Sequence, residues 1–311
     1  MATHTIDNQN VCIFKKPTST WRRGMVLLWC FFLCSYANAQ ILLPTYRGRL
    51  LEGITYNAAN NSLLWVDIIS AEVHRVSLED DSKLAETHET LKFAQPGESV
   101  GAVLLTKDPD TVLVCAKYGV ARANFATQEF SYLLKYPLSP ESASKLRSND
   151  GIIDPWGNLW IGLMNDFPTV KAQGKVEPDG LLYRISATDL SVKVMVEDAL
   201  IPNGLAFSKD ASTADGHIFQ AVFGQSAVLK YDLNGQPEQK FIIPAERVTC
   251  TGLGGKNDDE MFITTGHQQL DDFSAEIDAF DHTGDLGGFL FRVKLDKKIN
   301  SMPTGVWGGP V

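Results

Sequence analysis

The sequence predicts an all-β protein built from the repeated blades of a β-propeller, and two observations carry that prediction. A glycine followed by apolar residues recurs at positions 53, 101, 151, 204 and 252, so that consecutive glycines are 48, 50, 53 and 48 residues apart. After most of these points, a turn rich in Asn, Asp, Gly or Pro leads into a short apolar run. Several short strands per repeat of this length are typical of propellers, because a blade buries its faces only against its neighbours.

Short strands are expected in order along residues 50–311. Residues 63–67 and 72–76 form the first expected strand pair, and the second member alternates apolar and polar residues. Comparable runs follow at 112–114, 159–161, 180–184, 217–219, 227–232, 261–263 and 288–293. No sustained helical period occurs in this part of the chain, so residues 139–145 and 268–285 are expected to be loops.

Composition excludes some classes of partner. With 311 residues, of which 44% are hydrophobic, the chain can bury a sizeable core. Its net charge of −9 and the absence of clustered Lys and Arg argue against a nucleic-acid partner. Two of the five cysteines, Cys115 and Cys250, lie in the body of the chain and are 135 positions apart. That spacing fits neither a metal motif nor a disulfide framework, so both are expected to be buried thiols.

The N-terminal segment resembles a secretory leader. Basic residues up to Arg23 precede an apolar run at 24–33, and the small residues at 37–39 predict cleavage before Gln40. The run is shorter than the roughly 20 residues that span a bilayer, so no transmembrane span is expected in the mature chain. The long polar stretch before Arg22 leaves an uncleaved anchor or a misassigned start as alternatives. We therefore expect a leader at 1–39 and a propeller domain at 40–311, secreted if the leader is a signal peptide and cytoplasmic otherwise.

The residues that precede the five glycines predict a shared site. Equivalent positions of successive blades converge at one end of a propeller's central channel. Three of these positions hold Glu52, Asp150 and Asn203, and Asn149 lies one residue earlier. Their oxygen-rich side chains suit a hard cation.

Four segments carry a resemblance to a known family. They are LEGITYN (51–57) with SLLWVDI (62–68), RSNDG (147–151) leading into DPWGNLWIG (154–162), PNGLAFSKD (202–210) and VTCTGLGG (248–255). In this order they resemble the senescence marker protein, regucalcin and gluconolactonase family. The resemblance implies a six-bladed propeller that binds one divalent cation, commonly Ca²⁺ or Zn²⁺, at the channel mouth and hydrolyses sugar lactones.

The same resemblance implies roles for individual residues. It makes Glu52 and Asn203 metal ligands, and it makes Arg147 and Asn149 contacts to the substrate. Asp166 is the nearest counterpart of an acidic residue that faces substrate in the family, although its offset differs. Ser148 stands where an aromatic residue usually follows the arginine, which weakens the assignment of Arg147.

One expected element is absent. The family's third metal ligand, an Asp that is also the favoured general base, lies in a further blade, in a segment reading Asp-Gly-hydrophobic. No such segment occurs between Asn234-Gly235 and Lys240. We therefore predict about five blades, with one lost at that point through a skipped exon, a truncated gene model or a natural deletion. A gap is expected between the strands around Tyr231 and Phe241, which leaves sheet faces exposed.

Two functions follow from this pattern. The first is metal-dependent hydrolysis of a sugar lactone such as glucono-1,5-lactone, impaired by the missing blade. Asp150 is then the remaining candidate base, with capping of a turn as its competing structural role. The alternative is a non-catalytic calcium- or partner-binding propeller that keeps Glu52, Asn203 and Asn149 but has no base. The sequence does not predict the oligomeric state.

Overall fold

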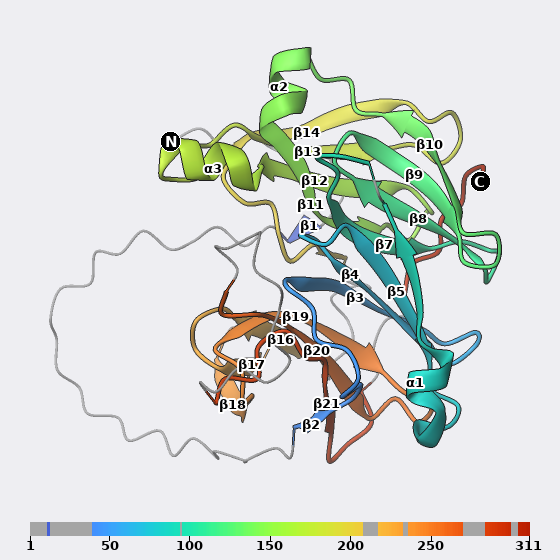
Figure 1. Cartoon of the computed structure of the whole chain (residues 1–311), viewed down its shortest axis with the longest axis vertical. Coiled ribbons are helices and arrows are strands. Elements are labelled where there is room, and N and C mark those ends of the chain that lie inside the picture. The colour runs from blue at the N-terminus through green and yellow to red at the C-terminus, as the bar shows by residue number, and fades with distance from the viewer. Residues whose placement is uncertain are drawn as a thin grey trace, which may run out of the picture.

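Five β-sheets form the body of the protein. The computed structural model describes residues 11–12, 39–93, 95–207, 217–232, 236–269, 284–299 and 304–311. The sheets follow one another as the blades of a five-bladed β-propeller, with the second and third blades at the top of Figure 1 and the fourth and fifth at the bottom. The predicted fold class is therefore confirmed.

The first three blades are four-stranded antiparallel meanders. The first contains β3 (Leu51–Asn57), β4 (Ser62–Asp67), β5 (Glu72–Ser77) and β6 (Glu89–Lys92). The second contains β7 (Val100–Leu105), β8 (Thr111–Ala116), β9 (Gly119–Asn124) and β10 (Glu129–Lys135). The third contains β11 (Leu146–Ile153), β12 (Leu159–Asn165), β13 (Gly180–Ile185) and β14 (Val192–Ala199).

The last two blades differ from this plan. The fourth has three described strands, β16 (Ile218–Val222), β17 (Ala227–Tyr231) and β18 (Pro237–Ile242). The fifth contains β19 (Arg247–Gly254), β20 (Glu260–Gly266) and β21 (Phe291–Lys294), and is completed by β2 (Gln40–Ile41). A separate short strand, β15 (Ala206–Phe207), pairs with β1 (Val11–Cys12). The rest of the predicted leader and most of the predicted loop at 268–285 lie outside the described residues.

The recurring glycines mark close approaches between the first strands of neighbouring blades. A Cβ atom at Gly101 would lie 2.6 Å from the backbone oxygen of Asn149 on β11, and one at Gly252 would lie 3.1 Å from Ile54 on β3. Both positions therefore need a residue without a side chain. The predicted equivalence of these glycines is confirmed for the first, second, third and fifth blades.

The second strand of a blade supplies much of the core. Strands β4, β8 and β12 are buried along their whole length. Their side chains join neighbouring blades into shared clusters, so that Val66 packs with Val103 and Val114, and Leu113 with Ile161. Burying one such side chain contributes roughly 1.5–3 kcal/mol. Each blade is therefore stabilised by the next one.

Helices are few and short. They are η1 (Asp81–Lys83), α1 (Leu84–Thr87), α2 (Pro140–Lys145) and α3 (Phe167–Gln173). The loop expected at 139–145 is wrong, because it contains α2: the Ser139 hydroxyl caps the helix by accepting from Ser142 N, with Pro140 in the first turn. Six residues are too few to show a helical period. No described helix has the length and hydrophobicity that crossing a membrane requires.

The ring has one open boundary. Packing runs from β16 through β19, β3 and β7 to β11, whereas no contact of comparable extent joins the third blade to the fourth among the described residues. We call the boundary between residues 202–207, beside the third blade, and β16–β18 the seam. Large apolar side chains are exposed on both of its flanks, with Leu200 54%, Ile201 51% and Phe223 58% exposed.

The predicted position of the gap is wrong. Strands β17 and β18 pair from Ala227 with Ile242 to Tyr231 with Pro237, with one register shift between Lys230 and Tyr231, so the strands around Tyr231 and Phe241 are hydrogen-bonded neighbours. The open boundary lies before β16 instead. The expectation of exposed apolar faces still holds at this new position.

Candidate active site at the channel mouth

The first strands of four blades are irregular near their recurring glycine. The ladder register shifts between Glu52 and Thr55 on β3 and between Ser148 and Gly151 on β11. Similar shifts occur on β7 and β19. A β-bulge re-aims the side chain it carries. On β11 the bulge falls on Asn149 and Asp150, so these two side chains leave the alternation of their strand.

Two of the predicted site carboxylates meet there. Burial and the nearby charge of Asp150 raise the pKa of Glu52 to about 8. Burial likewise raises the pKa of Asp150, although backbone N–H groups of residues 151, 204 and 205 partly offset that rise. Because like charges in a desolvated channel repel, each carboxylate favours either a proton or a cation.

Asn149 and Asp150 fasten the loop that carries Asn203. The Asn149 amide donates to the Pro202 oxygen over 3.0 Å, and Asp150 accepts from the Leu205 N–H over 3.0 Å. Asn203 itself is exposed, and its side-chain oxygen accepts from the Gly204 N–H at 2.9 Å. The structural role considered for Asp150 is thus present. A cation shared by Glu52 and Asn203 remains a prediction.

Arg147 is a buried cation at the same site, with 4% of its surface exposed. Its Nη1 donates to the Ser148 oxygen at 2.8 Å and to the Asn149 side-chain oxygen at 3.2 Å, and Nη2 lies 3.4 Å from Met164 Sδ. The guanidinium carbon lies 4.4 Å from the centre of the Phe167 ring. Burial lowers the pKa of Arg147 to about 10, while the charges of Asp166 and Glu52 act to raise it.

Asp166 lies close to Arg147 but is already paired. It caps α3, with its Oδ1 accepting from the Phe167 N–H at 2.8 Å, and its Oδ2 forms an ion pair with Lys117. Lys117 was not predicted as a site residue. The available signal was its position, because Lys117 directly follows β8 as Asp166 directly follows β12. A direct contact between Asp166 and substrate remains a prediction.

A thiol also lies at the channel. Burial, with the charges of Glu52 and Asp150, raises the pKa of Cys250. Cys115, packed in the core beside Ile161, likewise has its pKa raised by burial. Cys115 is buried as predicted, whereas Cys250 is only half-buried.

The channel fits a divalent cation incompletely. Glu52 and Asp150 offer oxygen ligands whose raised pKa values show how poorly the channel compensates their negative charge. Within the part of the chain that the structure describes, however, no three His, Cys, Asp or Glu residues are arranged to bind a metal. Two carboxylates with an amide oxygen suit a weaker site than three charged ligands would form.

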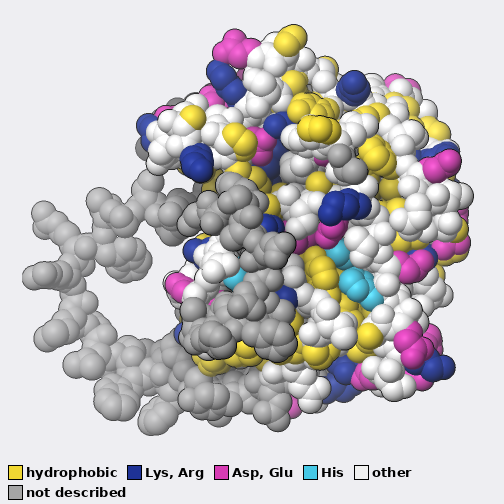
Figure 2. All heavy atoms as spheres, viewed as in Figure 1, with side chains coloured by type: hydrophobic (Ala, Val, Ile, Leu, Met, Phe, Trp, Pro, Cys, Tyr) yellow, Lys and Arg dark blue, Asp and Glu magenta, His cyan; other side chains and the backbone are white. Residues whose placement is uncertain are grey.

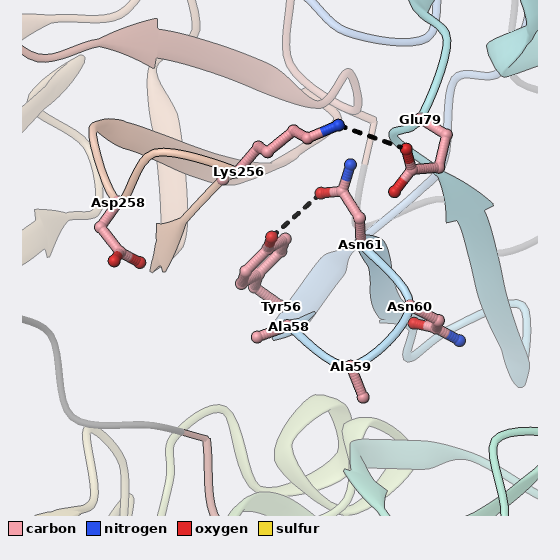
Figure 3. Close-up of a pocket in the computed structure, with 9 residues that line it drawn as sticks. Tyr56, Ala58, Ala59, Asn60, Asn61, Glu79, Lys256 and Asp258 are labelled. Atoms are coloured by element: carbon pink, nitrogen blue, oxygen red, sulfur yellow. Dashed lines mark hydrogen bonds and ion pairs between the residues drawn. The ribbon is translucent and has the colours of Figure 1, made fainter.

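A polar groove of about 320 Å³ lies elsewhere (Figure 3). It is lined by the turns after β3 and β19, where the Tyr56 hydroxyl donates to Asn61 at 2.9 Å and Lys256 lies 3.7 Å from Glu79. These turns are at the opposite ends of the strands from Glu52 and Cys250. The groove is therefore separate from the channel-mouth site.

Fold and site together define a β-propeller whose channel mouth carries carboxylate, amide and guanidinium groups on the first strands of the first and third blades. The model of the SMP-30/Gluconolactonase/LRE-like region matches residues 50–214 and 211–267. The chain belongs to this family.

Individual relatives agree with that assignment. The chain is 41% identical to the "Cell growth-regulated gene 1 protein" of Candida albicans, over 86% of this chain and 96% of that one. It is 25% identical to the pentonolactonase XacC of Haloferax volcanii, over 79% of this chain and 91% of that one. The crystal structure of regucalcin, a calcium-binding protein from Agrobacterium tumefaciens, superposes with a TM-score of 0.64 at 20% identity, covering 86% of this chain and 97% of that one.

Two of the alignments contain more positions than this chain supplies residues. The Candida albicans alignment spans 327 positions, but 86% of 311 residues is only about 267, so about 60 positions have no residue here. For the Haloferax volcanii protein, 293 positions against 79% of this chain leave about 47. Both values are close to one repeat of roughly 50 residues.

The two matches of the family model meet at residues 211–214, between β15 and β16. This junction indicates a different position for the loss from the one predicted after Gly235. Pro202, just before β15, contacts Gly162 of the third blade, whereas β16 packs against β19 of the fifth. Both candidate positions contain residues that favour turns, so the sequence alone did not show which of them is the site of the loss.

Proposed function

We propose that this protein is a sugar-lactone hydrolase that uses a divalent cation, Ca²⁺ or Zn²⁺, and that its activity is weakened by the missing segment. The observation that carries the proposal is the meeting of Glu52 and Asp150 with Arg147 and Asn149 at one end of the channel. All four residues lie in the segments that resemble the family. The pentonolactonase activity named for one relative supports a lactone as the substrate.

The residues have separable roles in this reaction. Glu52 and Asn203 would hold the cation, which when bound polarises the lactone carbonyl. Asp150 takes the proton of the attacking water, and its raised pKa brings its basicity closer to neutral pH. Arg147 and Asn149 orient the sugar hydroxyls. Water adds to the carbonyl carbon, the ring C–O bond breaks, and the alkoxide leaving group takes up a proton to give the open hydroxy acid.

The missing segment is the reason to expect weak activity. It removes the strand that carries the third carboxylate in the family, and a hard cation loses affinity with each charged ligand lost. The same loss supports the alternative, a propeller that binds calcium or a partner without catalysis. That alternative predicts binding of the cation with no turnover.

The deciding experiment measures hydrolysis of glucono-1,5-lactone and of pentonolactones by purified protein with Ca²⁺, Zn²⁺ or chelator, after subtraction of spontaneous hydrolysis. We expect cation-dependent turnover that falls by about 10²–10⁴-fold in Asp150→Asn, the range for loss of a general base. Asp258→Asn is the matched control, because Asp258 lines the separate groove. Calorimetric binding of the cation without turnover of any lactone would instead establish the non-catalytic alternative.

A further inference from the structure

We propose that the channel mouth selects lactones that carry a second, anionic group, such as the monolactone of a sugar diacid, and that Lys117 sets this preference by neutralising Asp166. The inference rests on the proposed function and adds the class of substrate. Nothing in the sequence comparison assigns a role to Lys117.

The first step concerns the charge of Asp166. Lys117 and Asp166 come from adjacent blades and are 7% and 5% exposed, so their ion pair is screened from water. Each Asp166 oxygen has a partner, since Oδ1 accepts from the Phe167 N–H and Oδ2 from Lys117. The pair as a whole carries no net charge, although the Asp166 carboxylate still acts on Arg147 through its charge. Lys117 thereby weakens the compensation that Asp166 could give Arg147.

The second step concerns Arg147 itself. The partners of its guanidinium are neutral: a backbone oxygen, an amide oxygen, a thioether sulfur and an aromatic ring. Among the described residues, no carboxylate lies within ion-pair distance of it, and its buried Nε–H has no hydrogen-bond partner. Buried arginines are normally paired, because an uncompensated buried charge is costly. Arg147 thus retains both a positive charge and a donor for a ligand.

The third step is the charge balance of the loaded site. Glu52 is the other carboxylate whose charge acts on Arg147, and with Asp150 it would compensate a bound divalent cation. Lys117 compensates Asp166, so one positive charge is left on Arg147. A neutral lactone would leave that charge unpaired, whereas a carboxylate substituent can accept two parallel hydrogen bonds from a guanidinium.

The test compares D-glucaro-1,4-lactone with D-glucono-1,4-lactone, which share a ring and differ by a carboxylate in place of a hydroxymethyl group. We expect the wild-type kcat/KM to favour the anionic lactone by about tenfold or more, the scale of one charge-assisted contact. Equal values, or a preference for the neutral lactone, would overturn the proposal.

Three variants give a signature that a merely structural ion pair cannot produce. Lys117→Met leaves the Asp166 carboxylate to balance Arg147, so the preference should fall toward unity. Asp166→Asn adds a positive charge through Lys117, so the preference should rise. The double variant removes both charges and should return to the wild-type ratio. Preferences that move in the same direction in both single variants would contradict the assignment, and thermal melts identify any variant that fails to fold.

Binding separates failure of this proposal from failure of the proposed function. Calorimetry of cation-loaded protein with glucarate and gluconate measures the same charge preference without turnover. Tighter binding of glucarate that is lost in Lys117→Met, with no hydrolysis of any lactone, would support the preference and reject the hydrolase. Hydrolysis without any charge preference would support the hydrolase and reject the role of Lys117.

Discussion

The closed side of the ring and the seam are built from the same kind of repeat, yet only the closed side is complete. In the first, second, third and fifth blades, other strands lie close to the recurring glycine. A Cβ atom at Gly101 would meet β11, and one at Gly252 would meet β3. At the seam, a Cβ atom on Gly204 would meet nothing within 4 Å, and β16 has no strand on its inner side among the described residues. Blade geometry therefore depends on a neighbour as well as on local sequence.

The two regions also contribute differently to the site. Glu52, Arg147, Asn149 and Asp150 lie on the closed side, while Asn203 lies at the seam beside the missing segment. The groups that orient substrate are thus held by complete blades. Cation binding depends more on the incomplete region, so it should suffer most from the loss.

Figure 2 adds that charged side chains of both signs are dispersed over the face shown, with no concentration of Lys and Arg. A surface of this kind offers no electrostatic footprint for nucleic acid on that face. This agrees with a small-molecule substrate at the channel mouth.

The largest expected effect comes from restoring the seam. Insertion at residues 211–214 of the corresponding Candida albicans segment should supply the missing strands and the Asp-Gly pair. We expect lactonase activity to rise by about 10²–10⁴-fold, the range for a general base, and the melting temperature to rise as apolar surface is buried.

The same segment inserted after Gly235 is the control, because it interrupts the hairpin between β17 and β18. Equal gains at both positions would show that the location of the loss is wrong. Replacing the inserted Asp by Asn separates the effect of the base from that of the blade.

A smaller effect is expected from truncating one leucine on the closed side of the ring and one leucine at the seam. Leu113 is fully buried between the second and third blades, whereas Leu200 is 54% exposed at the seam. Leu113→Ala should lower the free energy of unfolding by about 2–5 kcal/mol, and Leu200→Ala should change it by less than about 0.5 kcal/mol. Urea titration checks both values. A large cost at Leu200 would mean that another part of the chain covers the seam.

The smallest expected effect is on the pH dependence of stability. The folded-state pKa of Glu52 is raised from 4.5 to about 8, so its contribution is present below pH 4.5 and is lost as pH rises through 8. In chelator, the free energy of unfolding should therefore fall between pH 6 and pH 8.5. Glu52→Gln should flatten this fall, and added Ca²⁺ should oppose it by binding the ionised carboxylates. If the free energy of unfolding of Glu52→Gln depended on pH as in the wild type, a group other than Glu52 would have the raised pKa.

Much of the site could be predicted from sequence because a propeller repeats. The spacing of the glycines placed Glu52 and Asp150 on equivalent strands, and the structure brings their charges together. Helix α2 could not be found in this way, because one capped turn is shorter than the window in which a period appears.

The sequence alone could not predict which side chains pair between blades. Lys117 and Asp166 are 49 residues apart, and no local pattern links a lysine after β8 to an aspartate after β12. The position of the missing segment was hidden for a related reason. The sequence has turn-favouring residues both at Asn234-Gly235 and at Asp215-Gly216, and only strand pairing shows which strands are neighbours.

By itself, the sequence determined the repeat, the alternation of short strands and the identity of the polar residues before each glycine, because these depend on residue type and spacing along the chain. The tertiary structure decided which of those residues share a desolvated channel, which charges are already paired and which blade lacks a neighbour. These are properties of packing between segments far apart in the chain, where burial sets the electrostatics and a missing partner shows only as exposed apolar surface.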